Sequence, residues 1–239
     1  MEGSKGKILK EIGRTLKALS GKLGPFYIAG GTALSVFYFH HRESYDLDLF
    51  SREFSRDRAK EIIRDLSKAT GRVIKLDKEQ NKNGLIRMVV CFLYITKEET
   101  LKIDFVEDSQ ELLKPIKIVD GIPVLSIEDI YIRKILAVCG SSETLDMTGR
   151  KMFKGGRQEA RDFFDLYFLS ATFMPLSKFA FEYCTGPQME SLQVWYRTYN
   201  RSFIQVSILD IATDKKVSFR EMDHHFKKEI ENIVRKEMA

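Results

Sequence analysis

The sequence predicts an α/β (α+β) protein with a mixed sheet, followed by a helical C-terminal domain. Strand-like alternation of apolar and polar residues is concentrated in the first half of the chain. A glycine turn in that half joins a strand directly to a helix, and helical patterns dominate after about residue 125. We therefore expect an α/β core over residues 1–125 and a helical domain over residues 126–239.

The first half contains both helical and strand patterns, separated by glycine, proline or polar turns. Apolar residues at helical spacing predict helices over residues 8–19 and 32–39, and a charged amphipathic helix whose apolar stripe is Ala59, Ile62, Ile63, Leu66 and Ala69. Compact or alternating apolar runs predict strands over residues 26–29, 45–50, 72–76, 85–95 and 101–106. A polar turn is expected over residues 78–84, and a strand or hairpin around Asp120-Gly121.

The second half begins with a helix whose start is marked by its capping residues. Ser126 is a plausible N-cap, Asp129 partly imitates a capping box, and Gly140 ends the helix. Further helices are expected over residues 157–169, 176–183 and 219–238, while residues 190–211 show no clear pattern.

Composition restricts the class of protein. The 239 residues are 44% hydrophobic and 31% charged, which excludes disordered and fibrous classes. The longest apolar run, residues 88–95, is far shorter than the roughly 20 residues of a membrane span, and no secretory leader is visible. We therefore expect a cytoplasmic protein without a membrane partner.

Cysteine usage and charge add two expectations. Cys91, Cys139 and Cys184 lie in apolar stretches without C-x-x-C spacing, so we expect reduced, buried packing residues. The net charge of +5 would help to recruit a polyanion without proving that one binds. Positive charge is densest from Arg150 to Arg161, which indicates a mobile basic loop or, equally, a solvated surface turn.

Two carboxylates share one face of a predicted strand. Asp46 and Asp48 are two residues apart in an alternating run, so both point away from the apolar face. Asp104 lies on the polar face of another predicted strand. Like charges brought together repel unless a cation lies between them, and Mg²⁺ prefers carboxylate and phosphate oxygens. The pattern favours a metal site, although Asp46 and Asp48 could also simply face water.

A glycine turn precedes these carboxylates. Gly30, Gly31 and Thr32 lie where a strand enters a helix, so their backbone N–H groups could bind phosphate. A Gly-Gly pair alone is more often a tight turn. Ser44 could hydrogen-bond a phosphate or a metal-bound water, or could be a turn residue.

The order of these elements resembles the nucleotidyltransferase superfamily typified by DNA polymerase β. A glycine turn into a helix is followed by a D-x-D strand and then by a third strand aspartate. More specifically, the chain resembles the nucleotidyltransferases of the AbiEii/AbiGii toxin family. The motifs that carry this resemblance are Gly30-Gly31-Thr32-Ala33-Leu34, His41 to Phe50, Glu128 to Ala137 and Arg161 to Leu166.

The resemblance implies roles for individual residues. Asp46 and Asp48 would bind Mg²⁺ or Mn²⁺, and Asp104 would be the third metal carboxylate of polymerase β-like enzymes. Lys134 would contact the triphosphate, and Asp162 or Asp165 would complete the catalytic site. Gly30, Gly31, Thr32 and Ser44 would bind the nucleotide. From the residues alone, Lys134 could instead be a surface lysine, and the two helical aspartates could pair with Arg157 or Arg161.

The expected function is metal-dependent transfer of a nucleotidyl group from an NTP to an acceptor hydroxyl. The resemblance implies RNA, at the 3′ end of tRNA, as the acceptor, and a toxin of a toxin–antitoxin or abortive-infection system that an antitoxin protein restrains. Transfer to a small molecule or to a protein remains an alternative, as does a nucleotide-binding module without activity.

Overall fold

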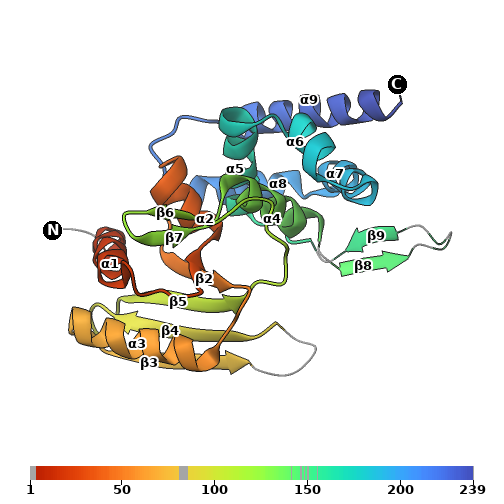
Figure 1. Ribbon diagram of the computed structural model, residues 1–239. Helices are drawn as coiled ribbons and strands as arrows, with labels where there is room; N and C mark the ends of the chain where they lie inside the picture. The colour runs from red at the N-terminus through yellow and green to blue at the C-terminus, as the bar shows by residue number, and fades with distance from the viewer. Residues whose placement is uncertain are drawn as a thin grey trace. The chain divides into compact units, whose positions relative to one another are not determined.

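The computed structural model describes residues 4–80, 86–140, 142–145, 147, 149, 151–154 and 156–238. The chain divides into two compact units, Met1–Asp129 and Ile130–Ala239 (Figure 1). The first unit combines a mixed sheet with helices, and the second is mainly helical. The predicted α/β class with a mixed sheet is therefore confirmed. The predicted domain boundary between residues 125 and 126 stays a prediction.

A seven-stranded sheet of order β3-β4-β5-β2-β1-β7-β6 forms the centre of the first unit. Its strands are β1 (Tyr27–Ile28), β2 (Asp46–Ser51), β3 (Ile74–Gln80), β4 (Met88–Tyr94), β5 (Thr100–Glu107), β6 (Lys117–Val119) and β7 (Ile122–Val124). The β2/β5 and β1/β7 pairs are parallel, whereas the other neighbouring strands are antiparallel. The parallel β2/β5 pair brings two strands together that are far apart in the sequence.

The helices of the first unit are α1 (Ser4–Leu19), α2 (Gly30–Ala33), the π-helix η1 (Leu34–Tyr38) and α3 (Arg56–Thr70). Helix α1 contacts α3 and β5, and α3 contacts β4. The Ser55 side chain accepts a hydrogen bond from the Arg58 N–H at the start of α3, and Gly71, with φ of +65°, ends the helix. Of the predicted apolar stripe, Ala69 is exposed, because it lies in the last turn, beyond the last buried residue Leu66.

The structure agrees with one predicted turn of the first unit and differs from another. The hairpin of β6 and β7 is confirmed, with Asp120 and Gly121 both at positive φ, as its tight turn requires. The predicted polar turn over residues 78–84 is wrong at its start, because β3 runs through Gln80. Pairing with β4 satisfies the backbone there although the side chains are exposed. Residues 81–85 lie outside the described part of the chain.

Helix α4 (Ile127–Cys139) begins as its capping residues predict. The Ser126 hydroxyl accepts a hydrogen bond from the Asp129 N–H at 3.0 Å and donates one to Asp129 Oδ2 at 2.6 Å. The same carboxylate accepts hydrogen bonds from the backbone N–H groups of Leu113 and Lys114. Through these hydrogen bonds the fully buried Asp129 connects the preceding loop to the start of the helix.

The second unit is built around aromatic side chains. Its elements after α4 are β8 (Ser142–Leu145), β9 (Lys151–Lys154), α5 (Ala160–Phe168), the π-helix η2 (Leu169–Phe173), α6 (Leu176–Tyr183), α7 (Gly186–Thr198), α8 (Arg201–Ser207), the 3₁₀-helix η3 (Ile208–Asp210) and α9 (Phe219–Glu237). The Phe163 ring contacts the rings of Trp195, Tyr199 and Phe226. These contacts hold α5, α7 and α9 together, and α7, α8 and η3 account for the segment without a clear sequence pattern.

The predicted basic loop over Arg150 to Arg161 is only partly present. Residues 151–154 pair with β8 as a strand, and α5 begins at Ala160 rather than at Arg157. Arg150 and Gly155 lie outside the described residues. The loop prediction is wrong for residues 151–154, because a run of charged residues does not exclude pairing as a strand.

The burial of the cysteines and the character of the helices can be compared with the sequence predictions. Cys91 and Cys139 are buried, Cys184 is partly buried, and all three are free. Burial raises the pKa of the Cys91 and Cys184 thiols to about 12, which makes them poor nucleophiles. Among the described helices, none combines the length and the apolar character that crossing a membrane needs.

Candidate active site

The acidic side chains of β2 lie on one face of the first unit's sheet. Asp46 and Asp48 are partly exposed, whereas Leu47 and Leu49, which point to the other face, are fully buried. In the parallel β2/β5 pair Asp48 lies directly opposite Asp104. Residues in register on neighbouring strands point to the same face. The structure therefore brings all three predicted metal carboxylates onto one face, which we call the acid face.

The glycine turn lies against this acid face. Gly30 has φ of +65°, and a Cβ atom at this position would lie 3.1 Å from Asp48 Oδ2. The Ala29 N–H donates a hydrogen bond to the Asp48 carbonyl oxygen at 3.2 Å. Glycine is needed here for two reasons, because the backbone is left-handed and because it passes close to a carboxylate.

The predicted nucleotide-binding hydroxyls fix the turn to the strand. Thr32 Oγ1 donates a hydrogen bond to the Asp46 carbonyl oxygen at 2.6 Å and shares another with Ser44 Oγ at 2.9 Å. Both side chains are buried. Their observed contacts give them a positioning role, and their predicted contact with a nucleotide stays a prediction, as does that of Gly31.

Sequence reasoning missed a lysine on the acid face. Lys102 lies opposite Asp46, and its ammonium donates a hydrogen bond to Asp104 Oδ2 at 2.5 Å. Burial alone lowers the pKa of Lys102, but the hydrogen bond to Asp104 and the charges of Asp104, Asp46 and Asp48 outweigh it and raise the pKa. Lys102 precedes Asp104 by two residues, so strand alternation could have revealed it.

The donor atoms of the acid face suit a hard divalent cation. Carboxylate oxygens are the ligands that Mg²⁺ and Mn²⁺ prefer. Asp104 Oδ1 is buried and accepts no hydrogen bond from the described residues, so it offers an oxygen toward such an ion. Within the described ranges, no group of three His, Cys, Asp or Glu side chains is already arranged around a common metal position. Asp46, Asp48 and Asp104 as a complete ligand set therefore stay a prediction.

The other predicted catalytic residues form a buried ion cluster in the second unit. Lys134 Nζ lies 2.7 Å from Asp162 Oδ1 and 2.7 Å from Asp165 Oδ2. Arg157 pairs with Asp162 through both its Nε and its terminal nitrogen. Lys134, Asp162 and Asp165 are each less than a tenth exposed, so Lys134 is not the surface lysine of the alternative interpretation. The alternative pairing of Asp162 with Arg157 is present.

Neighbouring positive charges stabilise the ionised form of Asp162 in this cluster. Burial by itself would raise the pKa of Asp162, but the charge of Lys134 and the hydrogen bond and charge of Arg157 lower it below its usual value. The Asp162 carboxylate is thus held ionised in a buried position, at the expense of desolvating Asp162 and Lys134. These contacts explain the cluster as a structural element, and the catalytic roles of its members stay predictions.

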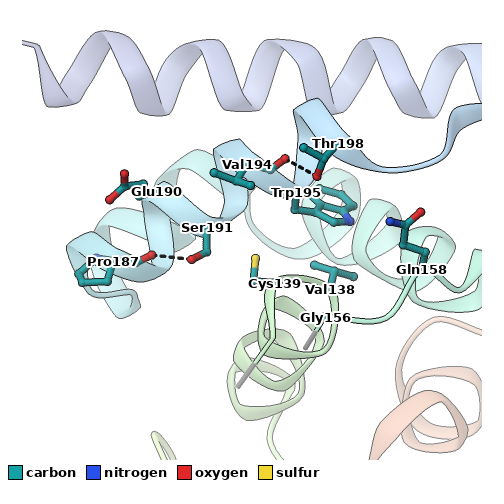
Figure 2. A pocket seen from close by; sticks show the side chains of 10 residues that line it. All are labelled: Val138, Cys139, Gly156, Gln158, Pro187, Glu190, Ser191, Val194, Trp195 and Thr198. Carbon is teal, nitrogen blue, oxygen red and sulfur yellow. Dashed lines mark hydrogen bonds between the residues drawn. The ribbon is translucent and has the colours of Figure 1, made fainter. Parts of the chain in front are cut away.

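A cavity elsewhere in the second unit does not compete for this role. Figure 2 shows its lining, which comes from the end of α4, the segment before α5, and α7. Its volume of about 160 Å³ is below the roughly 300 Å³ at which ligand pockets begin. The hydroxyls of Ser191 and Thr198 are bonded to the helix backbone, and burial raises the pKa of Cys139 far above its usual value. The cavity therefore offers neither the room nor a reactive group.

A comparison with known protein families finds one that matches most of the chain. The model of a family described as nucleotidyl transferase AbiEii toxin, Type IV TA system, matches residues 14–238. Among curated proteins none matches significantly.

Solved structures agree at the level of the fold. The crystal structure of JHP933 from Helicobacter pylori has a TM-score of 0.60 at 17% identity, and the match covers 100% of this chain and 97% of that one. MenT4, a nucleotidyltransferase toxin from Mycobacterium tuberculosis, has a TM-score of 0.55 at 12% identity, with 98% and 86% covered.

Replacing Lys134 with Met should destabilise the protein. The substitution keeps the stem but leaves Asp162 and Asp165 buried without their shared cation, a loss for which about 3–5 kcal/mol is typical. Chemical denaturation measures the free energy of unfolding. The exposed helical lysine Lys178 is the matched control, and Lys178→Met should change that free energy by less than about 0.5 kcal/mol. Equal effects of the two substitutions would contradict a structural role of the cluster.

The Asp162 ion pairs should make stability depend on pH in the acid range. Because the folded pKa of Asp162 is lowered, its contribution is present above the unfolded pKa of about 3.9 and is lost as the pH falls through the lower folded value. The difference in unfolding free energy between the wild type and Asp162→Asn should shrink below about pH 4. Denaturation curves from pH 7 to 3 test this, with the exposed Asp210→Asn as control. A difference that stays constant over this range would show that the Asp162 ion pairs do not contribute to stability.

Proposed function

Because the chain belongs to the AbiEii nucleotidyl transferase toxin family of toxin–antitoxin systems, we propose that it transfers a nucleotidyl group from an NTP to an RNA hydroxyl in a metal-dependent reaction. The acid face carries this proposal, since Asp46, Asp48 and Asp104 share it and Gly30 passes against Asp48. Transferase activity and the toxin family follow from the family match, whereas the metal, the acceptor and the residue roles are ours.

Asp46 and Asp48 are the residues we assign to hold Mg²⁺ or Mn²⁺, with Asp104 as the third carboxylate. When bound, the ion would lower the pKa of the attacking hydroxyl and offset the negative charge that develops in phosphoryl transfer. The partial exposure of both β2 carboxylates supports the assignment, because a ligand can reach them from solvent. Their apolar neighbours on the opposite face hold the strand in a fixed register.

The reaction needs positioning more than covalent catalysis. The acceptor oxygen attacks the α-phosphorus, the bond from the α-phosphorus to its bridging oxygen breaks, and pyrophosphate leaves while the hydroxyl proton passes to a base or to solvent. We assign Gly30, Gly31, Thr32 and Ser44 to the nucleotide side. Lys134 is assigned to the triphosphate.

Asp162 and Asp165 complete the proposed catalytic set. Because Lys134 is bound to both of them, they would also hold its ammonium in position.

The acceptor we favour is RNA, at the 3′ end of tRNA. The net charge of +5 supports a polyanionic partner. An enzyme that modified this end without control would block translation, so a cognate antitoxin is part of the proposal. A small molecule or a protein as acceptor, and a module that binds a nucleotide without turnover, are outcomes that the following experiment separates.

Removing one carboxylate of the proposed metal pair should abolish transfer. The protein is incubated with each α-labelled NTP, Mg²⁺ and total tRNA, and label is followed into RNA, protein and small molecules. Asp46→Asn and Asp48→Asn should each lower the rate by about a thousandfold, since a few kcal/mol of charge stabilisation is lost. Asp77→Asn removes an exposed aspartate from β3 of the same sheet and should leave the rate unchanged. Full activity in both β2 variants would remove the mechanism.

A methyl group at position 30 should damage the site more than the fold. Gly30 and Gly71 both have φ of +65°, but only at position 30 would a Cβ meet a carboxylate. Gly30→Ala and Gly71→Ala should each cost about 1–2 kcal/mol of unfolding free energy through the left-handed backbone. Only Gly30→Ala should also lower the transfer rate. Equal rates in the two variants, at equal stability, would show that the approach of Gly30 to Asp48 has no part in the reaction.

A further inference from the structure

The acid face contains a positive charge that the proposed reaction does not use. Lys102 extends from β5 on the same face as the three carboxylates. Its ammonium binds Asp104 Oδ2, while the second oxygen of that carboxylate is buried without a hydrogen bond from the described residues. Lys102 is partly exposed, at 39% of its side chain, so it can leave the carboxylate for solvent without unfolding the strand.

The position of Lys102 affects the repulsion between the carboxylates of the acid face. Three carboxylates on one face repel one another, and a neighbouring positive charge relieves that repulsion. In register, Lys102 lies opposite Asp46 and two residues before Asp104, which itself lies opposite Asp48. The ammonium therefore supplies, within the chain, part of the charge that a divalent cation would supply.

A divalent cation and this ammonium are attracted to the same carboxylate. A Mg²⁺ or Mn²⁺ ion that bound Asp104 through Oδ1 would share the carboxylate whose Oδ2 accepts the Lys102 hydrogen bond. The two positive charges would also repel each other across a few ångström in a partly buried site, where screening by water is incomplete. This repulsion makes it unfavourable for the ion and the Lys102 ammonium to bind the Asp104 carboxylate at the same time.

We propose that Lys102 is a resident counter-ion that competes with the divalent cation for the acid face. Binding of the ion breaks the Lys102 to Asp104 pair, so Lys102 weakens metal binding in the absence of nucleotide. This inference rests on the proposed metal site at Asp46 and Asp48, and it adds a residue that sets how tightly that site holds its ion.

The competition predicts tighter metal binding when the ammonium is removed. Mn²⁺ serves as the probe, and its free concentration is measured by electron paramagnetic resonance in titrations of the whole protein without nucleotide. Lys102→Met and Lys102→Gln should bind Mn²⁺ about tenfold more tightly than the wild type. Lys102→Arg, which keeps the charge, should bind like the wild type. Lys78→Met removes an exposed charge from β3 and controls for net charge.

A second readout keeps the test decisive if the neutral variants fold poorly. Without metal, the carboxylate repulsion in Lys102→Met is no longer relieved, so its melting temperature should fall below that of the wild type. Added Mn²⁺ should raise the melting temperature of Lys102→Met more than that of the wild type, because tighter binding stabilises the folded state more. A purely structural ion pair would lower the melting temperature without this larger response.

The outcomes separate the inference from the function on which it rests. If the wild type binds Mn²⁺ and Asp46→Asn abolishes the binding, but the neutral Lys102 variants bind no more tightly, the competition is wrong and the metal site stands. If Mn²⁺ binding is absent from every variant, or does not depend on Asp46 and Asp48, the proposed metal site itself is wrong. Tighter binding in Lys78→Met to the same extent would reduce the effect to net charge.

Discussion

Bringing carboxylates together on one face of a sheet is unfavourable, and the rest of the first unit is arranged to hold them there. The parallel pairing of β2 with β5 sets Asp48 opposite Asp104. On the other face Leu47, Leu49 and Ile103 are fully buried. A slip of one residue would expose these side chains and bury the aspartates, so the hydrophobic core fixes the register against the electrostatic repulsion. The apolar face is thus what stabilises the acid face.

The two charge clusters of the protein differ in burial. In the second unit Lys134 lies between Asp162 and Asp165, and all three side chains are less than a tenth exposed. On the acid face Asp46, Asp48 and Asp104 are partly exposed, and Lys102 contacts Asp104. An ion from solvent can reach a partly exposed carboxylate without first opening a buried ion pair, which favours the acid face as the site for a guest cation.

The sequence predicted the parts of this architecture that depend on local chemistry. Alternation placed Asp46 and Asp48 on one face of β2 and Asp104 on the polar face of β5, and the pairing of the two strands then brings all three together. The Ser126 cap marked the start of α4, and the Asp120-Gly121 turn marked its hairpin. What it missed depends on partners distant in the sequence. The strands β8 and β9 and the helix α8 are short, so their sequence patterns are weak. The sequence offered Arg157 and Arg161 as partners of Asp162, and the pairing with Lys134 appeared only once the helices were packed. Lys102 follows the same alternation, because it precedes Asp104 by two residues.

The glycine turn contacts the backbone of Asp46 and Asp48, while the chemistry we propose uses their carboxylates. Thr32 holds Asp46 by its carbonyl oxygen, and the Ala29 N–H holds Asp48 in the same way. The turn therefore attaches to the backbone of the acid strand, and the absence of a side chain at Gly30 leaves the Asp48 carboxylate its space. Because these attachments do not involve the carboxylate oxygens, a change of charge at Asp46 or Asp48 alters the electrostatics of the face without removing the contacts that place it. The backbone attachments of the turn and the charge of the acid face therefore depend on different atoms.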